Sequence, residues 1–318
     1  MKQLKSGFWT TLAAVGMSLA FTVTVAAQEK AQESRTEIKD VKPKNKVEGQ
    51  DVDEIIENRR LRATTGSKSR LSVATRFNYS GGSINDPTSR ERPNIRGGAN
   101  ALTSASLFGL LNGKYSLTSQ DSIFAGVGVF WTTPFHEKEG PRDQQIDLND
   151  PGVSYQRVGK LGSATSVTTV GLTYFTTEWR RNLGQTASLS LSQNFLWTVG
   201  KTGFQYGIAG TISGSSFEKD DPALLGEQSD YSVGFFPYAE YVLNDTFNLR
   251  TVVGKILQHT RDNADQPYTF LENALYQSVG LGISVTRDIF FYPNIQFIPE
   301  DFRAEKTNVA VSANINVF

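Results

Sequence analysis

The chain has 318 residues, 38% of them hydrophobic and 11% aromatic, and its 32 basic residues equal its 32 acidic ones. Because cysteine is absent, disulfide frameworks, thiolate metal sites, cysteine nucleophiles and a lipidated N-terminal cysteine are all excluded. The balanced charge gives no reason to expect nucleic acid as a partner.

Residues 1–27 have the pattern of a signal peptide. Lys2 and Lys5 form a basic start, an uncharged run follows from Ser6, and the run ends in the small residues Ala26 and Ala27. We predict export with cleavage after Ala27. An uncleaved membrane anchor is the alternative, because the uncharged run is long enough to span a bilayer. Beyond it no apolar run predicts a membrane-spanning helix.

Residues 28–66 form a highly charged extension. Nine acidic and nine basic residues occur among these 39, with no aromatic residue, so the segment cannot bury enough apolar surface to fold alone. We predict a mostly disordered periplasmic extension. Within it, Val52, Ile55 and Ile56 have helical spacing behind an acidic first turn. Such a helix could dock onto a partner or plug a pore; a transient helix in a linker is favoured, because a lone short helix is marginally stable in water.

From Arg70 onward, apolar residues alternate with polar or small ones, which is typical of strands with one apolar face. The fold class is therefore all-β, and the barrel domain is placed at residues 67–318. We count twelve strands, with ten or fourteen as alternatives, near residues 69–79, 101–117, 123–133, 153–160, 165–177, 186–199, 203–213, 231–243, 247–257, 274–285, 289–298 and 307–318.

Three features favour a transmembrane barrel over a soluble sheet. The polar faces carry mainly Ser, Gly, Asn, Gln and Thr, which suit a wet lumen better than a solvent-exposed surface. Many segments alternate over the length that a tilted strand needs to cross a hydrocarbon layer. Connections alternate between tight turns and long loops, as in outer-membrane barrels. Aromatic residues near both strand ends predict two interfacial girdles.

Two of the predicted strands are irregular. In the fourth, Arg157 shares the face of Val153 and Tyr155, and in the ninth the apolar face changes phase around Val252 and Val253, as a bulge would produce.

The sequence resembles the Gram-negative outer-membrane β-barrel superfamily, porin-like members in particular, over residues 69–318. The resemblance rests on the antiparallel up-and-down pattern and on the terminal Phe318, which would serve as the barrel-assembly signal. It implies location in the cell outer membrane and contact with lipid, lipopolysaccharide and the barrel-assembly machinery. Phe318 departs from the family pattern, because it shares the phase of Asn316 and Asn314 and not that of the apolar Val317.

A twelve-stranded barrel encloses a narrow lumen, so we expect a channel for passive passage of small solutes or ions. The predicted lumen-lining charges are four basic residues and one acidic residue, namely Arg76, Lys114, Lys160, Arg250 and Glu240. They would give a weak anion preference, or would pair with one another and with loop carboxylates and select nothing.

Two alternatives remain open at this point. A structural or interaction protein with a plugged lumen is one, with the extension reaching a periplasmic partner. An outer-membrane lipid-modifying or proteolytic enzyme is the other, because His136 and His259 lie where strands meet outer loops, close in sequence to Asp143, Asp147, Asp150 and Asp262. No family spacing of histidine and serine supports catalysis, so we predict that the protein is not an enzyme. We expect no cofactor. We also expect no metal, because the cluster of Asp147, Asn149 and Asp150 lacks the spacing of a calcium loop.

Overall fold

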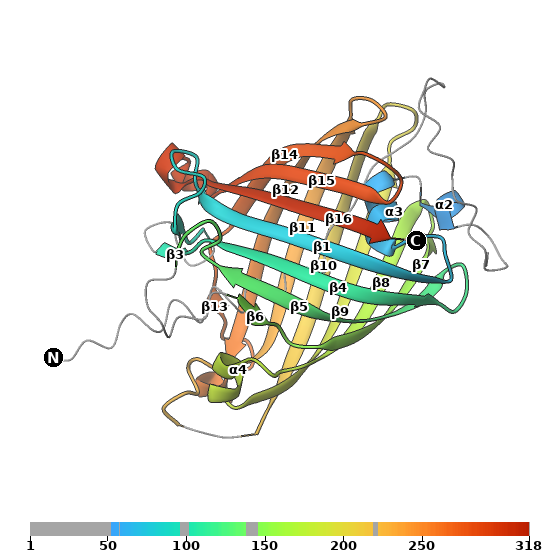
Figure 1. Ribbon diagram of the computed structural model, residues 1–318. Coiled ribbons are helices and arrows are strands. Elements are labelled where there is room, and N and C mark those ends of the chain that lie inside the picture. Colours follow the sequence, from blue (N-terminus) through green and yellow to red (C-terminus); the bar gives the residue numbers. More distant parts are fainter. Residues whose placement is uncertain (1–51, 57, 96–101, 138–145, 219–221, 318) are drawn as a thin grey trace.

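In the computed structural model, which describes residues 52–317 except 57, 96–101, 138–145 and 219–221, twelve long antiparallel strands close into a barrel (Figure 1). Each strand pairs with its neighbour in sequence, and β1 pairs with β16 to close the ring. The strands are β1 (Leu71–Ser83), β4 (Ser106–Ser116), β5 (Asp121–Thr132), β7 (Gly152–Leu161), β8 (Ala164–Tyr174), β9 (Gln185–Thr198), β10 (Phe204–Phe217), β11 (Ser229–Val242), β12 (Phe247–Thr260), β14 (Tyr276–Ser284), β15 (Ile289–Phe297) and β16 (Asn308–Val317).

Along each strand, the residues that alternate between apolar and polar in the sequence point alternately to the outside and the inside of the barrel. Leu111, Leu189 and Leu249 are 50%, 60% and 49% exposed on the outer surface, whereas the inward Ser192 and Asn248 are buried. A closed ring of strands satisfies every internal backbone group, which is the condition for crossing lipid with strands. The outer belt is therefore the lipid-facing surface, and the predicted all-β transmembrane barrel of twelve strands is confirmed.

The two ends of the barrel differ as predicted. Tight turns join β4 to β5, β7 to β8, β9 to β10, β11 to β12 and β14 to β15 at one end, where both β1 begins and β16 ends. In the β7–β8 turn, Gly162 has a φ of +58°, a conformation that favours glycine. Long loops lie at the other end, and they mark it as the extracellular side. None of the helices in the described ranges has the length and apolar composition that spanning a membrane requires.

Several short strands and helical turns lie at the extracellular end. They are β2 (Glu91–Pro93), β3 (Leu102–Ser104), β6 (Ile146–Leu148), α4 (Glu178–Asn182), β13 (Leu271–Glu272) and three 3-10 turns, η1 (Arg261–Asn263), η2 (Pro299–Asp301) and η3 (Ala304–Lys306). Figure 1 shows β3 and α4 at this end, opposite to the helices α2 (Val52–Ile55) and α3 (Arg59–Thr65).

The two irregular strands have different explanations. Arg157 points outward at the periplasmic rim, where its Nη1 lies 2.9 Å from Asp121 Oδ1 on the neighbouring strand, so a charge on the apolar face is neutralised at the interface. The predicted bulge in β12 is wrong: the register with β11 is the same at Lys255 as at Asn248, and β12 pairs with β14 from Phe247 to Gly254 without a shift. The phase changes because Val252 and Ile256 are apolar residues that point inward, where they are buried.

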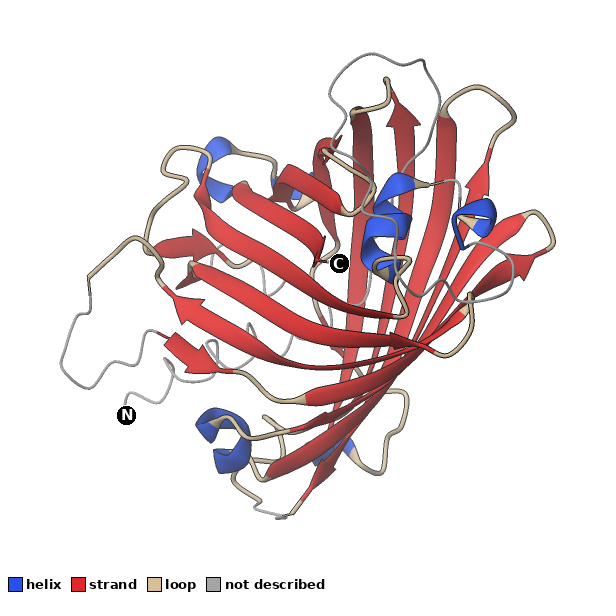
Figure 2. Ribbon diagram, turned by 45° about the vertical axis from the view of Figure 1, so that its right-hand side comes forward, coloured by secondary structure: helices blue, strands red, loops and turns tan. Residues whose placement is uncertain are grey.

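These inward apolar residues meet the N-terminal helices, which lie inside the periplasmic end of the barrel near the end of β16 (Figure 2). Part of the segment expected to be a disordered extension thus forms the helices α2 and α3, and its residues Ile55, Ile56 and Leu61 are buried. Isolated short helices are unstable, and here the barrel wall supplies the packing that the sequence segment lacks. The predicted signal peptide and residues 28–51 lie outside the described residues, as does Phe318.

Candidate functional site: a plugged lumen with a polar cavity

Residues 52–66, hereafter the plug, pack into the lumen through three apolar side chains. Ile55, Ile56 and Leu61 are at most 3% exposed and share one cluster with inward residues of the wall. The wall members of this cluster are Val158, Val167, Leu196, Ala209, Phe236, Tyr238, Val252, Ile256 and Tyr276. Burying one side chain of this size contributes about 2 kcal/mol. The plug is therefore held by a dedicated apolar patch on an otherwise polar inner face.

A buried charge cluster fixes α3 against the opposite wall. Arg60 of the plug is 1% exposed, and its Nη1 lies 3.7 Å from Glu240 Oε1, which also accepts a 2.7 Å hydrogen bond from Arg250 Nε. The Arg60 guanidinium lies 5.8 Å from the ring centroids of Phe290 and Tyr292. Charges removed from water need such partners, because an unpaired buried charge is strongly unfavourable. Glu240 and Arg250, predicted as lumen charges, therefore form an ion pair that receives the plug.

A second ion-pair cluster, hereafter the latch, lies at the periplasmic base. Asp53 of α2 contacts Arg287 of the β14–β15 turn through two oxygens, at 2.8 Å to Nη2 and 3.2 Å to Nε. Lys68 Nζ lies 3.1 Å from the same carboxylate. Arg287 Nη1 also donates to the Gly66 carbonyl at 2.9 Å. The latch thus ties both ends of the plug to one turn of the barrel.

The latch sets the ionisation of Asp53. Burial alone would raise the pKa of this carboxyl, but the hydrogen bond and charge of Arg287, together with the charges of Arg62 and Lys68, outweigh burial and hold the pKa below its ordinary value. Asp53 is therefore a carboxylate whenever the plug is docked at neutral pH.

The other predicted lumen cations have different positions. Arg76 Nη2 donates to the Thr64 carbonyl at 3.1 Å, and Lys114 Nζ donates to the Ser67 carbonyl at 2.7 Å. Both hold the backbone at the end of the plug. Lys160 is exposed at the periplasmic end of β7. Four of the five predicted residues thus lie inside the barrel and Lys160 lies at its rim; their influence on solute selection stays a prediction.

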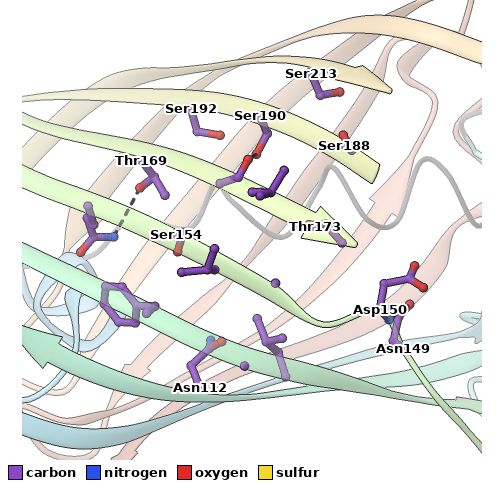
Figure 3. Close-up of a pocket in the computed structure, with 18 of the residues that line it drawn as sticks. Asn112, Asn149, Asp150, Ser154, Thr169, Thr173, Ser188, Ser190, Ser192 and Ser213 are labelled. Atoms are coloured by element: carbon purple, nitrogen blue, oxygen red, sulfur yellow. Dashed lines mark hydrogen bonds between the residues drawn. The ribbon is translucent and has the colours of Figure 1, made fainter. Parts of the chain in front are cut away.

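Between the plug and the extracellular end lies a cavity of about 240 Å³, bounded mainly by β4, β5 and β7–β11 (Figure 3). Leu61 and Thr64 of the plug form part of its lining, together with Arg76. Hydroxyl and amide side chains predominate on the strands, and Figure 3 shows them around the space: Asn112, Asn149, Ser154, Thr169, Thr173, Ser188, Ser190, Ser192 and Ser213. The lumen is therefore polar where the plug leaves it open.

A buried ion pair borders this cavity near the extracellular end. Arg180 of α4 lies 3.0 Å from Asp150, and the two side chains are 4% and 3% exposed. Asp150 Oδ1 also accepts the backbone amides of Thr176 and Thr177 at 2.6 and 2.9 Å. The Arg180 guanidinium stacks 4.0 Å from the Phe175 ring centroid. Asp150 thus anchors the extracellular loop that carries α4.

The loop between β1 and β4 also reaches inward. Ile95 is 2% exposed and belongs to the same apolar cluster as the plug residues, and Asn308 Nδ2 donates to the Pro93 carbonyl at 2.8 Å. Segments from both ends of the barrel therefore contribute to one apolar cluster, and two of its members, Leu61 and Val167, also line the cavity.

The two histidines occupy structural positions at the extracellular end. His259 Nδ1 lies 2.7 Å from Asp230, its Nε2 contacts the carbonyls of Asn263 and Gln266, and its ring stacks on Tyr231 at 4.4 Å. His136 Nε2 lies 2.6 Å from the Thr88 carbonyl. The ring nitrogens of His259 thus hold a loop, and its acidic neighbour is Asp230 and not Asp262.

Sequence reasoning missed the residues that hold the plug, Arg60, Asp53 and Arg287, and the pair of Asp150 with Arg180. One signal was present: Val158, Val167, Leu196 and Val252 are apolar residues on faces made mainly of polar residues and glycine. Apolar residues on the lumen face predict that something apolar covers them.

Comparisons with known proteins find likenesses among solved structures alone, at low identity. No protein-family model and no curated protein matches the sequence. The outer membrane channel COG4313 from Pseudomonas putida F1 aligns with 79% of this chain and 96% of its own, at 11% identity and a TM-score of 0.48. The NanC porin aligns with 77% of this chain and 97% of its own, at 13% identity and a TM-score of 0.44. The KdgM porin aligns with 78% and 98%, at 8% identity and a TM-score of 0.38.

The architecture of the barrel itself assigns the fold. A closed, even-numbered antiparallel barrel with a lipid-facing apolar belt, a polar interior, short turns at one end and long loops at the other is the architecture of bacterial outer-membrane barrels. The protein therefore has the fold of a bacterial outer-membrane β-barrel.

Proposed function

We propose that this protein is a narrow, non-enzymatic outer-membrane channel for small polar solutes, and that the plug closes it in the conformation seen here. The observation that carries the proposal is the polar cavity, whose floor is formed by the plug residues Leu61 and Thr64. A lumen sealed for structural reasons alone would be filled by its own strand side chains. Here the strands leave space, and a separate segment occupies the periplasmic part.

The contacts of the plug support reversible closure. It adds no strand to the sheet, and it is held by side-chain contacts, namely the apolar patch, the Arg60–Glu240 contact, the latch, and the hydrogen bonds of Arg76 and Lys114 near its end. When the plug leaves, Glu240 and Arg250 still neutralise each other at 2.7 Å, so the wall is not left with an unpaired buried charge from this pair. The barrel can therefore keep its closed ring of strands without the plug.

Planar-bilayer recording of a variant that lacks residues 52–66, next to the full chain, tests the proposal. We expect steady conductance from the deletion variant and a mostly silent full chain, because removal opens the polar lumen. A salt-gradient reversal potential then reports the sign of the preferred ion. Absence of conductance in the folded deletion variant would defeat the channel proposal and favour a structural protein with a plugged lumen.

A further inference from the structure

We infer that the polar cavity is a binding site for a small, neutral, polyhydroxylated solute of the size of a monosaccharide. The inference deepens the proposed function, because it names the class of solute that would occupy the path above the plug. It rests on the arrangement of hydroxyl groups, on the pairing of the charges and on the presence of aromatic faces.

The hydroxyl groups form ordered tiers across neighbouring strands. One tier runs through Ser154, Gly171, Ser190, Ser213 and Ser232, each paired in register with the next on β7 to β11. A second tier runs through Gln156, Thr169, Ser192 and Thr211, and a third through Gly152, Thr173, Ser188 and Ser215. Inward residues in register stand side by side on one face. The wall is thus a two-dimensional array of short donors and acceptors without a charged member.

Several of these groups are available to a ligand. Asn112, Ser154, Thr173 and Ser188 line the cavity, and none of the four makes a side-chain hydrogen bond within the described part of the chain. Each hydroxyl can donate one hydrogen bond and accept others, and the amide can do both. A solute with several hydroxyl groups offers the matching donors and acceptors.

The charged groups that border the cavity already make contacts within the protein. Arg76 donates to the Thr64 carbonyl, and Asp150 and Arg180 contact each other at 3.0 Å with both side chains buried. A charged solute would lose water on entry and would have to displace one of these contacts to gain an opposite charge, which is unfavourable. Neutral solutes avoid that cost.

Aromatic residues and size narrow the class further. Phe108 and Phe124 also line the cavity, at 7% and 6% exposed, whereas the ring of Phe175 is covered by Arg180. An aromatic surface beside a hydroxyl array suits a molecule with an apolar C–H face and a hydroxylated rim. The volume of about 240 Å³ lies below the ~300–1,000 Å³ of pockets for drug-sized ligands. A single sugar ring fits this description.

Saturation-transfer difference NMR on the full chain in detergent micelles tests the inference, with glucose, glucuronate and glucosamine as probes. We expect glucose to bind and the two charged analogues to bind at least tenfold more weakly. The double variant Ser154→Ala/Ser188→Ala removes two available hydroxyls without breaking an internal bond, so it should fold normally and weaken glucose binding about tenfold. Ser163→Ala, at an exposed position of the β7–β8 turn, is the matched control and should leave binding unchanged.

The outcomes separate this inference from the channel proposal, because binding in micelles does not require conduction. Equal or tighter binding of glucuronate or glucosamine, no binding of any probe, or glucose binding that the double variant leaves unchanged would overturn the inference even if the plug-deleted barrel conducts. Selective glucose binding by a barrel that never conducts would support the site and defeat the channel.

Discussion

The substitution Asp53→Asn should release the plug. It removes the charge that faces Arg287, Lys68 and Arg62 while keeping the size of the side chain. Asp53 and Arg287 are 13% and 21% exposed, so their interaction lies between an exposed pair, worth at most about 1 kcal/mol, and a buried pair, whose disruption costs about 3–5 kcal/mol. We take about 2 kcal/mol as the loss. At 1.4 kcal/mol per factor of ten, the ratio of undocked to docked plug rises about 30-fold.

The natural absence of cysteine makes the measurement clean. A single Thr65→Cys, at a position of α3 that is 3% exposed and outside the lining of the cavity, reports undocking through its rate of reaction with a membrane-impermeant maleimide. When reaction is slow compared with redocking, the rate is proportional to the undocked fraction. We expect the rate to rise about 30-fold in the Asp53→Asn background.

The matched control is Asp121→Asn, which removes an ion pair at the same end of the barrel, with Arg157, without touching the plug. It should leave the maleimide rate unchanged. An Asp53→Asn rate equal to that of the parent, or an equal rise in the control, would refute the latch.

Four further results are expected. Docking lowers the pKa of Asp53, so the latch stabilises the docked plug fully at pH values above the ordinary pKa near 3.8. This stabilisation is lost as the pH falls through that value toward the lower pKa of the docked state. Conductance should therefore rise below about pH 4, and Asp53→Asn should make the conductance less dependent on pH in this range. Glu240→Gln leaves Arg60 and Arg250 without their shared carboxylate, so the melting temperature should fall by an amount that corresponds to about 3 kcal/mol; an unchanged melting temperature would show that the cluster is not needed. Asp150→Asn weakens the anchor of the α4 loop, so limited proteolysis should cut residues 175–184 faster than in the parent. Arg157→Ala removes an exposed interfacial pair and should leave thermal unfolding unchanged; a clear loss would contradict its assignment to the rim.

The barrel itself could be predicted from the sequence because strand period, strand length and loop rhythm are local properties. Alternation decides the face of each residue, and a register error of one would have moved the outward-facing leucines to the lumen. The predicted strand at 247–257, for example, lies within β12, Phe247–Thr260. The bulge expected there failed because alternation assumes one environment for each face, and the plug creates a second apolar environment inside.

The site was less accessible to sequence reasoning because its contacts join distant segments. Asp53 and Arg287 are separated by 234 positions, and no local sequence pattern around either residue indicates that the two are in contact. Composition alone indicated disorder for residues 28–66, since the apolar surface that stabilises the plug belongs to the barrel wall. Most of the charged residues predicted to line the lumen do lie inside the barrel. Their role as partners of the plug could not be predicted, because it depends on the folded arrangement.

Reversible crosslinking of the plug to the barrel is the most direct test that the plug occludes the lumen, because the current is compared in the same molecule before and after release. In the Asp53→Asn background, Ala63→Cys on α3 and Asn316→Cys on β16 would be joined by a reducible bifunctional thiol reagent, since Asn316 Nδ2 lies 2.7 Å from the Ala63 carbonyl. Single-channel current should be absent while the crosslink is intact and should appear when a reductant is added. Equal current before and after reduction would contradict occlusion of the lumen by residues 52–66.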